Sequence, residues 1–289
     1  MKTMNKTIFK GIIMLLAAMV MTGCDSFLDI TPTGKVIAKT GKEYRALLTY
    51  EYKNFPEDRG LATLRGDEIT LDKTTTKAED YDSYFDIWAW NDLSQQSTTV
   101  SFGWRRYYHA IYIANYIIEN KDKITEATAD EINQLVGEAY MMRAYCHFLL
   151  VNLFAEPYTH CNAATTRGVP LSLKADVNAV LSCSSVEQVY QQVVDDVAKA
   201  KKHLTVEQWE EGYPYRFNTV SADALMARVC LYKGDWQNAL AAAQAVIEKH
   251  GELEDLTVSK VMPNYYKSVE SIVALEQVMT SSYVRIGAP

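Results

Sequence analysis

Residues 219–251 read TVSADALMARVCLYKGDWQNALAAAQAVIEKHG and predict two helices joined by a tight turn. The first helix runs to Lys233, after which Gly234 can adopt the left-handed conformation that ends a helix. Asp235 can then cap a second helix, whose apolar side chains recur at helical spacing until Gly251. The stretch therefore predicts an antiparallel helix pair.

The small residues in this pair match the tetratricopeptide (TPR) pattern, in which a helix–turn–helix unit takes about 34 residues. Ala227 falls at the small position of the first helix, and Trp236 falls at the turn. Ala239 and Ala243 lie in the second helix, where small side chains allow the two backbones to approach closely. Cys230 departs from the tyrosine that is usual at its position. We expect Trp236 to pack in the core.

Three runs upstream have the same periodicity. In residues 103–120 and 130–154 apolar side chains recur at steps of three and four, which defines one face of a helix. Residues 185–204 repeat the pattern after a sequence that resembles a capping box. The runs 103–120 with 130–154, and 185–204 with 219–250, suggest stacked antiparallel pairs. Because each pair leaves an apolar face for its neighbour to cover, the sequence predicts a mainly all-α fold, an α-α superhelix of TPR-like pairs with long irregular loops.

The segments between these runs are less regular. Residues 41–53 predict a further helix, and residues 54–100 predict a loop with short helical turns. Residues 157–184 and 205–218 predict long loops, because they contain proline and glycine and no sustained period. Residues 259–280 fit either a strand or a short helix.

The first 24 residues indicate export. Residues 1–10 carry three lysines and no acid, and residues 12–21 are an unbroken apolar run. Ten apolar residues are too few to cross a hydrocarbon core, which takes roughly 20 helical residues. A basic start, a short apolar core and small residues at the cleavage site are typical of a secretory signal peptide. Cys24 directly after Gly23 resembles the acylated cysteine of a bacterial lipobox, with Met21 where leucine is usual.

This pattern divides the chain into a signal peptide (1–23), a lipid-anchored tether (24–40) and a helical domain (41–289). Lipidation of Cys24 would hold the domain on a membrane, because each buried methylene contributes about 0.8 kcal/mol. Two alternatives are an ordinary signal peptide in which Cys24 is a chance residue, and an uncleaved anchor helix.

Composition narrows the class of protein. Of 289 residues 48% are hydrophobic, 22% are charged and 11% are aromatic, which excludes a disordered chain, a collagen-like fibre and a polytopic membrane protein. The 29 basic and 36 acidic residues give a formal net charge of −7. Removal of Lys2, Lys6 and Lys10 with the signal peptide leaves 26 against 36, or −10. A surface this acidic disfavours nucleic-acid binding.

No motif indicates catalysis, a cofactor or a metal. The sequence lacks the HExxH, GxSxG, Walker A and GxGxxG patterns, and no carboxylate pair stands out. Cys146 and His147 are adjacent on a helix and point about 100° apart, so they cannot easily share one ion. Cys161 and Cys183 lie in one predicted loop of an exported protein, where either a disulfide or two free thiols is possible.

Four segments, in this order, resemble SusD/RagB-type nutrient-uptake lipoproteins. They are Cys24–Pro32 (CDSFLDITP), the block Gly137–Tyr145 running on to Phe154–Pro157, the TPR-like Ala224–Ile247, and Glu270–Ile272. No single motif is decisive, but the ordered set is fairly specific and covers nearly all of residues 24–280.

The resemblance implies a lipid-anchored, surface-exposed outer-membrane protein of Bacteroidota that sits as a lid on a SusC-like TonB-dependent receptor. It implies binding of a glycan, or of a peptide in RagB-type members, and delivery inward without chemistry or a cofactor. Family members are usually much longer, so the sequence is expected to correspond to the N-terminal, TPR-containing part of a truncated member.

Five residues are the candidates for the ligand site. Family members use tryptophans and an asparagine of this region, which implies roles for Trp88, Trp90 and Asn91 in glycan binding, with Arg65 and Asp67 as companions. Aromatic faces stack on the C–H surfaces of sugars, and planar amide, carboxylate or guanidinium groups pair with hydroxyls. The alternative is that one tryptophan packs on the helices and the other side chains are solvated. Asn115 and Arg143 we interpret as satisfied structural groups.

Two other functions compete with nutrient binding. A TPR adaptor would bind protein partners in its concave groove without a sugar site of its own. A secreted hydrolase is disfavoured because the sequence has no catalytic constellation.

Overall fold

The computed structural model describes residues 38–275, apart from 57, 68–69, 94, 101 and 261–264. Its contacts divide the chain into two units, residues 1–38 and 39–289, and every described helix and strand belongs to the second. The predicted signal peptide and the lipidation site at Cys24 lie outside the described residues.

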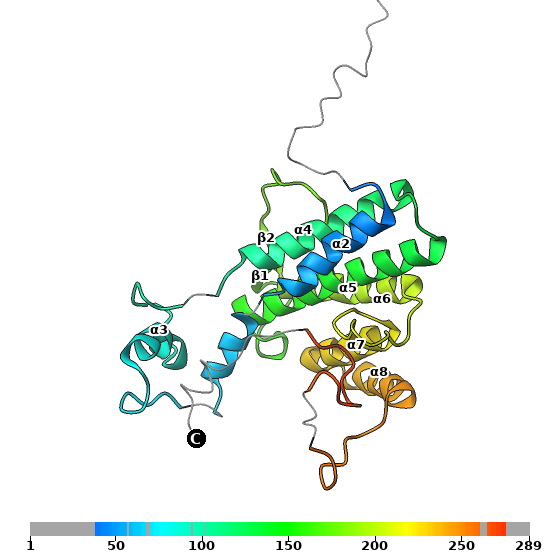
Figure 1. The fold of residues 1–289 in the computed structure, drawn as a ribbon. Helices are drawn as coiled ribbons and strands as arrows, with labels where there is room; N and C mark the ends of the chain where they lie inside the picture. Colours follow the sequence, from blue (N-terminus) through cyan, green and yellow to red (C-terminus); the bar gives the residue numbers. More distant parts are fainter. Residues whose placement is uncertain are drawn as a thin grey trace, which may run out of the picture. The chain divides into compact units, whose positions relative to one another are not determined.

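The second unit is mainly helical (Figure 1). Its helices and strands, with η for 3-10 helices, are α2 (Gly41–Lys53), η2 (Asp58–Arg65), α3 (Ala78–Trp88), α4 (Arg105–Asn120), η3 (Lys121–Lys123), α5 (Ala129–Phe154), η4 (Tyr158–His160), β1 (Arg167–Pro170), β2 (Cys183–Ser185), α6 (Val186–His203), α7 (Thr219–Lys233) and α8 (Trp236–Lys249).

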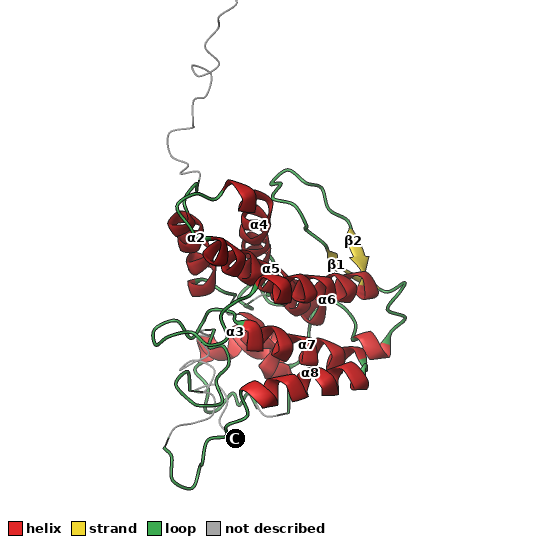
Figure 2. Ribbon diagram, turned by 90° about the vertical axis from the view of Figure 1, so that its right-hand side faces the viewer, coloured by secondary structure: helices red, strands yellow, loops and turns green. Residues whose placement is uncertain are grey.

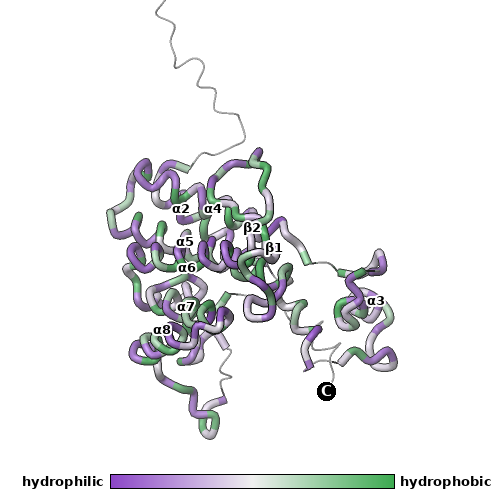
Figure 3. Tube along the Cα trace, turned by 180° about the vertical axis from the view of Figure 1, so that it is seen from behind, coloured by the Kyte–Doolittle hydropathy of each residue, from purple (hydrophilic) through white to green (hydrophobic). Residues whose placement is uncertain are grey.

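The long helix α5 is the centre of the fold. It packs against α4 on one side and α6 on the other, and α6 contacts α7, which pairs with α8 (Figures 1 and 2). Buried side chains occur all around α5, from Leu135 to Val151, whereas α8 buries only Ala239 among its residues. Hydrophobic and hydrophilic stretches alternate along the helices (Figure 3). The prediction of a mainly all-α fold built from packed helix pairs is confirmed.

Local sequence signals fix where the helices begin and end. Ser185 caps α6 in the predicted capping box, and Thr128 and Thr40 cap α5 and α2 in the same way. Gly234 has φ +75°, the left-handed conformation expected at the end of α7, and Asp235 caps α8.

The helices of the central layer approach one another closely. A Cβ atom built on Gly137 of α5 would lie 2.8 Å from the backbone nitrogen and from Cγ of Leu204, the residue that follows α6. Only a residue without a side chain fits this contact. The glycine therefore lets the end of α6 lie directly on α5.

A buried polar network joins three of the helices. Arg143 of α5 donates a forked pair of hydrogen bonds to Asp196 of α6, at 2.8 and 2.6 Å, and a third at 2.7 Å to Asn115 Oδ1 of α4. The amide of Asn115 donates to the carbonyls of Ser172 and Lys174. All three side chains are structural and satisfied, as predicted for Asn115 and Arg143.

The start of the second unit is joined to the segment before α5. Thr40 and Thr125 form an isolated parallel bridge, in which the Gly41 N–H donates to the Thr125 carbonyl at 2.8 Å. The Thr125 N–H donates in turn to the Lys39 carbonyl at 2.9 Å.

The structure corrects several expectations about the irregular segments. Within 54–100 it contains a full helix, α3, and residues 157–185 contain an antiparallel two-stranded sheet of β1 and β2. The described part of 259–280 has turns and bends in place of a strand or helix. Cys161 and Cys183 are free and half-buried.

Trp236 was expected in the core and is instead 66% exposed. With Leu240 and Ile247 it forms an exposed apolar face of α8. No helix among the described residues is long and apolar enough to span a membrane.

Candidate ligand-binding site

The predicted site residues lie where η2, α3 and the segment after α3 meet. A small core of Leu61, Leu64 and Ile87 joins η2 to α3, with Tyr84, Val100 and Phe102 packed against it. Arg65 is the last residue of η2 and Trp88 the last of α3. The two elements therefore present their ends, and the loop that follows, on a common support.

Asp86 holds the loop after α3 in place. Its buried carboxylate accepts hydrogen bonds from the Asn91 side chain at 2.8 Å, the Gln96 N–H at 2.7 Å and the Thr99 hydroxyl at 2.5 Å. These hydrogen bonds, led by that of Thr99, lower the pKa of Asp86 because they favour the ionised form. Asn91, Gln96 and Thr99 are thereby held against α3.

Trp90 lies two residues after the end of α3, and its side chain is exposed. Its φ of +56° is in the left-handed region, which a non-glycine residue adopts infrequently, and the residue is 63% exposed. The guanidinium carbon of Arg65 lies 4.8 Å from the Trp90 ring centroid and 5.4 Å from that of Phe102. Arg65 also forms an ion pair with Asp92. An exposed indole, a guanidinium and a carboxylate thus lie together, which is the chemistry that recognises sugar rings and their hydroxyls.

The five predicted residues are not equally placed. Trp90 and Arg65 are in contact, and Asn91 is adjacent, but the Asn91 amide already donates to Asp86. Trp88 is half-buried, with its ring 5.9 Å from that of Phe85, as the alternative interpretation of one packed tryptophan expects. Asp67 is exposed, and within the described residues no hydrogen bond or ion pair joins it to this cluster.

Asp92, which follows Asn91 directly, belongs to the aromatic patch of the sequence but was not among the five predicted site residues. The neighbouring acid in Trp-Ala-Trp-Asn-Asp is the signal that could have pointed to it, because a carboxylate beside an exposed aromatic ring suits a sugar. Its pairing with Arg65, 27 residues away, is a product of the fold.

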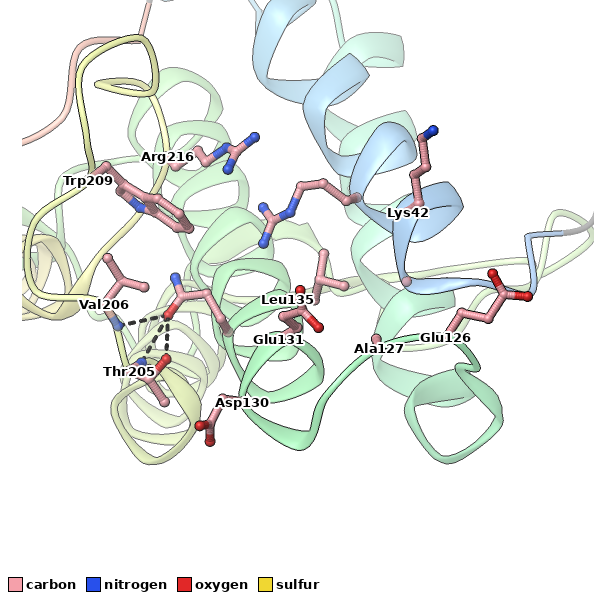
Figure 4. Close-up of a pocket in the computed structure, with 13 residues that line it drawn as sticks. Lys42, Glu126, Ala127, Asp130, Glu131, Leu135, Thr205, Val206, Trp209 and Arg216 are labelled. Carbon is pink, nitrogen blue, oxygen red and sulfur yellow. Dashed lines mark hydrogen bonds between the residues drawn. The ribbon is translucent and has the colours of Figure 1, made fainter.

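A separate hollow of about 470 Å³ lies between α2, the first turns of α5 and the segment after α6 (Figure 4). Arg45, Trp209 and Arg216 line it, together with acidic residues near the start of α5. The sequence analysis gave no role to this region. Within the described residues no group of three or more His, Cys, Asp or Glu is placed to hold a metal ion.

A family model described as "Starch-binding associating with outer membrane", the SusD-like model, matches residues 27–231. SusD-like protein P38 of Formosa agariphila is 26% identical over 250 residues, which is 84% of this chain and 46% of that protein.

Solved structures show the same fold. A SusD superfamily protein of Bacteroides thetaiotaomicron has a TM-score of 0.63 at 25% identity, over 74% of this chain and 48% of that one. A laminarin-binding SusD-like protein has a TM-score of 0.60 at 21% identity, over 78% of this chain and 47% of its own. The chain spans about half the length of these relatives.

Proposed function

This chain belongs to the SusD-like family, and we propose that it binds a glycan nutrient at the cell surface and delivers it to a SusC-like TonB-dependent transporter. The family consists of binding proteins and not of enzymes. The proposal therefore assigns capture and hand-over to this chain and leaves energy-driven transport to the barrel.

The cluster at Trp90 carries the proposal. The indole is more than half exposed, and the loop that presents it is fixed by the hydrogen bonds of Asp86. One edge of the cluster carries the Arg65–Asp92 pair, which can donate to and accept from hydroxyls. A rigid aromatic face with polar groups beside it loses little entropy on binding. We assign sugar stacking to Trp90, hydroxyl contacts to Arg65 and Asn91, and supporting roles to Trp88 and Asp67.

The membrane attachment is proposed from the sequence. Residues 1–23 would be removed, Cys24 would be acylated, and residues 24–40 would link the lipid to the helical domain of residues 41–289. Replacement of Cys24 with alanine should release the protein from the membrane fraction and abolish incorporation of labelled palmitate. Membrane retention of the variant would contradict the anchor.

Affinity electrophoresis on a panel of polysaccharides tests the glycan site. We expect the protein to be retarded by its glycan. Trp90→Ala should lose most of that retardation, because it removes the indole ring on which a sugar would stack. Trp236→Ala is the matched control, since Trp236 is 66% exposed but lies on α8. Equal retardation of both variants and the parent would remove Trp90 from the site, and no retardation by any glycan would favour the protein-binding adaptor.

The partnership is tested separately. Delivery of the glycan to a transporter predicts that the membrane-extracted protein co-purifies with a TonB-dependent receptor. Recovery of the protein alone, under conditions that preserve other outer-membrane complexes, would contradict the hand-over.

A further inference from the structure

The hollow between α2, α5 and residues 204–218 contains a guanidinium, that of Arg216, with which no carboxylate of the described residues forms an ion pair. Arg216 lines this hollow, and among the described residues it forms no ion pair and no side-chain hydrogen bond. Its Nε is buried without an acceptor. A partly buried cation in this state is costly unless a ligand or solvent satisfies its donors.

Aromatic rings hold the Arg216 side chain in position. Its guanidinium carbon lies 3.9 Å from the ring centroid of Tyr213, 4.9 Å from that of Trp209 and 5.7 Å from that of Tyr215. The Trp209 ring is itself fixed by a 3.0 Å hydrogen bond from Nε1 to the Phe217 carbonyl. These contacts stabilise the positive charge but use none of its N–H donors, so the planar fork remains available.

Two other side chains that line the hollow, Arg45 and Gln134, are in contrast already paired with a carboxylate behind it, that of Glu138. Glu138 accepts two hydrogen bonds from Arg45, at 2.8 and 2.9 Å, one from Tyr52 at 2.9 Å and one from Gln134 at 3.0 Å. The Gln134 carbonyl oxygen accepts from the N–H groups of Thr205 and Val206. Arg45 and Gln134 are therefore held in place, whereas no ion pair or side-chain hydrogen bond among the described residues uses the donors of Arg216.

The charges around the hollow are separated. In Figure 4 the guanidinium of Arg216 points from its loop toward α2, while Asp130 and Glu126 lie at other edges. Asp130, Glu126 and Glu131 are exposed, so solvent screens their repulsion of an anion at Arg216. The carboxylates of Asp130 and Glu126 can instead accept hydrogen bonds from hydroxyl groups. The lining thus suits a molecule with a carboxylate at one end and hydroxyls at the other.

We propose that this hollow is a second glycan-binding site, specific for a uronic acid residue whose carboxylate receives a forked pair of hydrogen bonds from Arg216. The volume of about 470 Å³ lies within the range of about 300–1,000 Å³ that is usual for small-molecule sites. The planar guanidinium matches a carboxylate in geometry as well as in charge. The inference rests on the proposed glycan-binding function and extends it to acidic sugars.

Calorimetric titration with cellobiouronic acid and with cellobiose tests this site, because the two disaccharides differ only at C6 of the non-reducing sugar, a carboxylate in one and a hydroxymethyl group in the other. We expect the acid to bind more tightly than cellobiose. Arg216→Gln should lower the affinity for the acid by about 10- to 100-fold, with little effect on the affinity for cellobiose. Arg228→Gln, at an exposed arginine of α7, is the control and should change neither affinity. Added salt should lower the affinity for the acid and leave that for cellobiose unchanged.

Further variants separate the possible failures. Arg216→Lys keeps the charge without the fork and should lie between the parent and Arg216→Gln, with an unchanged circular dichroism spectrum as the test of folding. The inference would be overturned if the two disaccharides bound with equal affinity, or if Arg216→Gln weakened the binding of both equally. The main proposal would still be supported in that case if Trp90→Ala lost polysaccharide binding. Absence of any glycan binding would instead contradict the proposed function itself.

Discussion

At the scale of single residues, Arg143 joins three helices through buried hydrogen bonds. Its two hydrogen bonds to Asp196 and its hydrogen bond to Asn115 are buried. Removal of the guanidinium therefore leaves the buried Asp196 carboxylate without its cation. We expect Arg143→Ala to lower the free energy of unfolding by about 3–5 kcal/mol in urea titrations. Arg228→Ala, at an exposed site, should change it by less than about 0.5 kcal/mol. A small loss in Arg143→Ala would show that solvent replaces the pair.

The buried imidazole of His147, on the same helix as Arg143, makes the stability of the fold depend on pH. Burial, and then the charge of Arg143, lower the pKa of His147 to about 3, while its Nε2 accepts from the Ser172 N–H at 3.4 Å. The folded protein therefore keeps the imidazole neutral, and the unfolded chain takes up a proton below about pH 6.5. Stability from this group is complete above pH 6.5 and is lost as the pH falls toward 3.

The pH dependence can be measured against a variant. Between pH 7 and pH 5 we expect the parent to lose about 2 kcal/mol more unfolding free energy than His147→Gln, because glutamine accepts the same hydrogen bond without titrating. Parallel curves for the two proteins would place the imidazole pKa near its ordinary value.

Sequence reasoning identified Asn115 and Arg143 as structural, because polar side chains within an apolar helical seam need buried partners. It could not rank Trp88 and Trp90. The difference between them depends on the left-handed backbone of Trp90 and on hydrogen bonds to Asp86, neither of which has a periodic signal. Arg216 was missed because its aromatic neighbours occur in an irregular segment.

At the scale of elements, the contact between α5 and the end of α6 gives a prediction in which two effects have opposite signs. Helix propensity alone would make Gly137→Ala stabilising by about 1 kcal/mol. The new Cβ would lie 2.8 Å from the backbone nitrogen of Leu204, which cannot rotate away. We therefore expect a net loss of about 1–3 kcal/mol in thermal or urea unfolding. A raised melting temperature would show that the helices separate easily.

The helices with the clearest caps and periods were predictable. The boundaries of α6 and α7 follow from Ser185 and Gly234, whose roles depend on local backbone chemistry. The helix α3 was not found, because its apolar residues cover a small satellite core and few of them are buried. The β1–β2 pairing was missed because four- and three-residue strands carry too little pattern.

At the scale of the whole molecule, the outer face of α8 has no covering element among the described residues. Leu240 and Ile247 are 61% and 65% exposed. We expect Leu240→Gln with Ile247→Gln to change the unfolding free energy by less than about 0.5 kcal/mol and to shorten retention on a hydrophobic column. Val229→Gln, at a fully buried site of α7, should by contrast be strongly destabilising. A large loss in the double variant would mean that this face is packed in solution.

The general architecture was predictable because stacked helix pairs repeat one pattern, and the family follows from landmarks in a fixed order. The exposure of Trp236 was not predictable, since a TPR-like turn residue is buried only where a neighbouring repeat covers it.

The bridge between Thr40 and Thr125 has a mechanical consequence. In a protein held at its amino end, any tension along the tether would first load the hydrogen bonds among Lys39, Gly41 and Thr125, a few residues before α5. Force would then pass to the most deeply packed helix without first stretching the peripheral loops. Drag on the domain would consequently reach the buried helix α5 and not α2 alone.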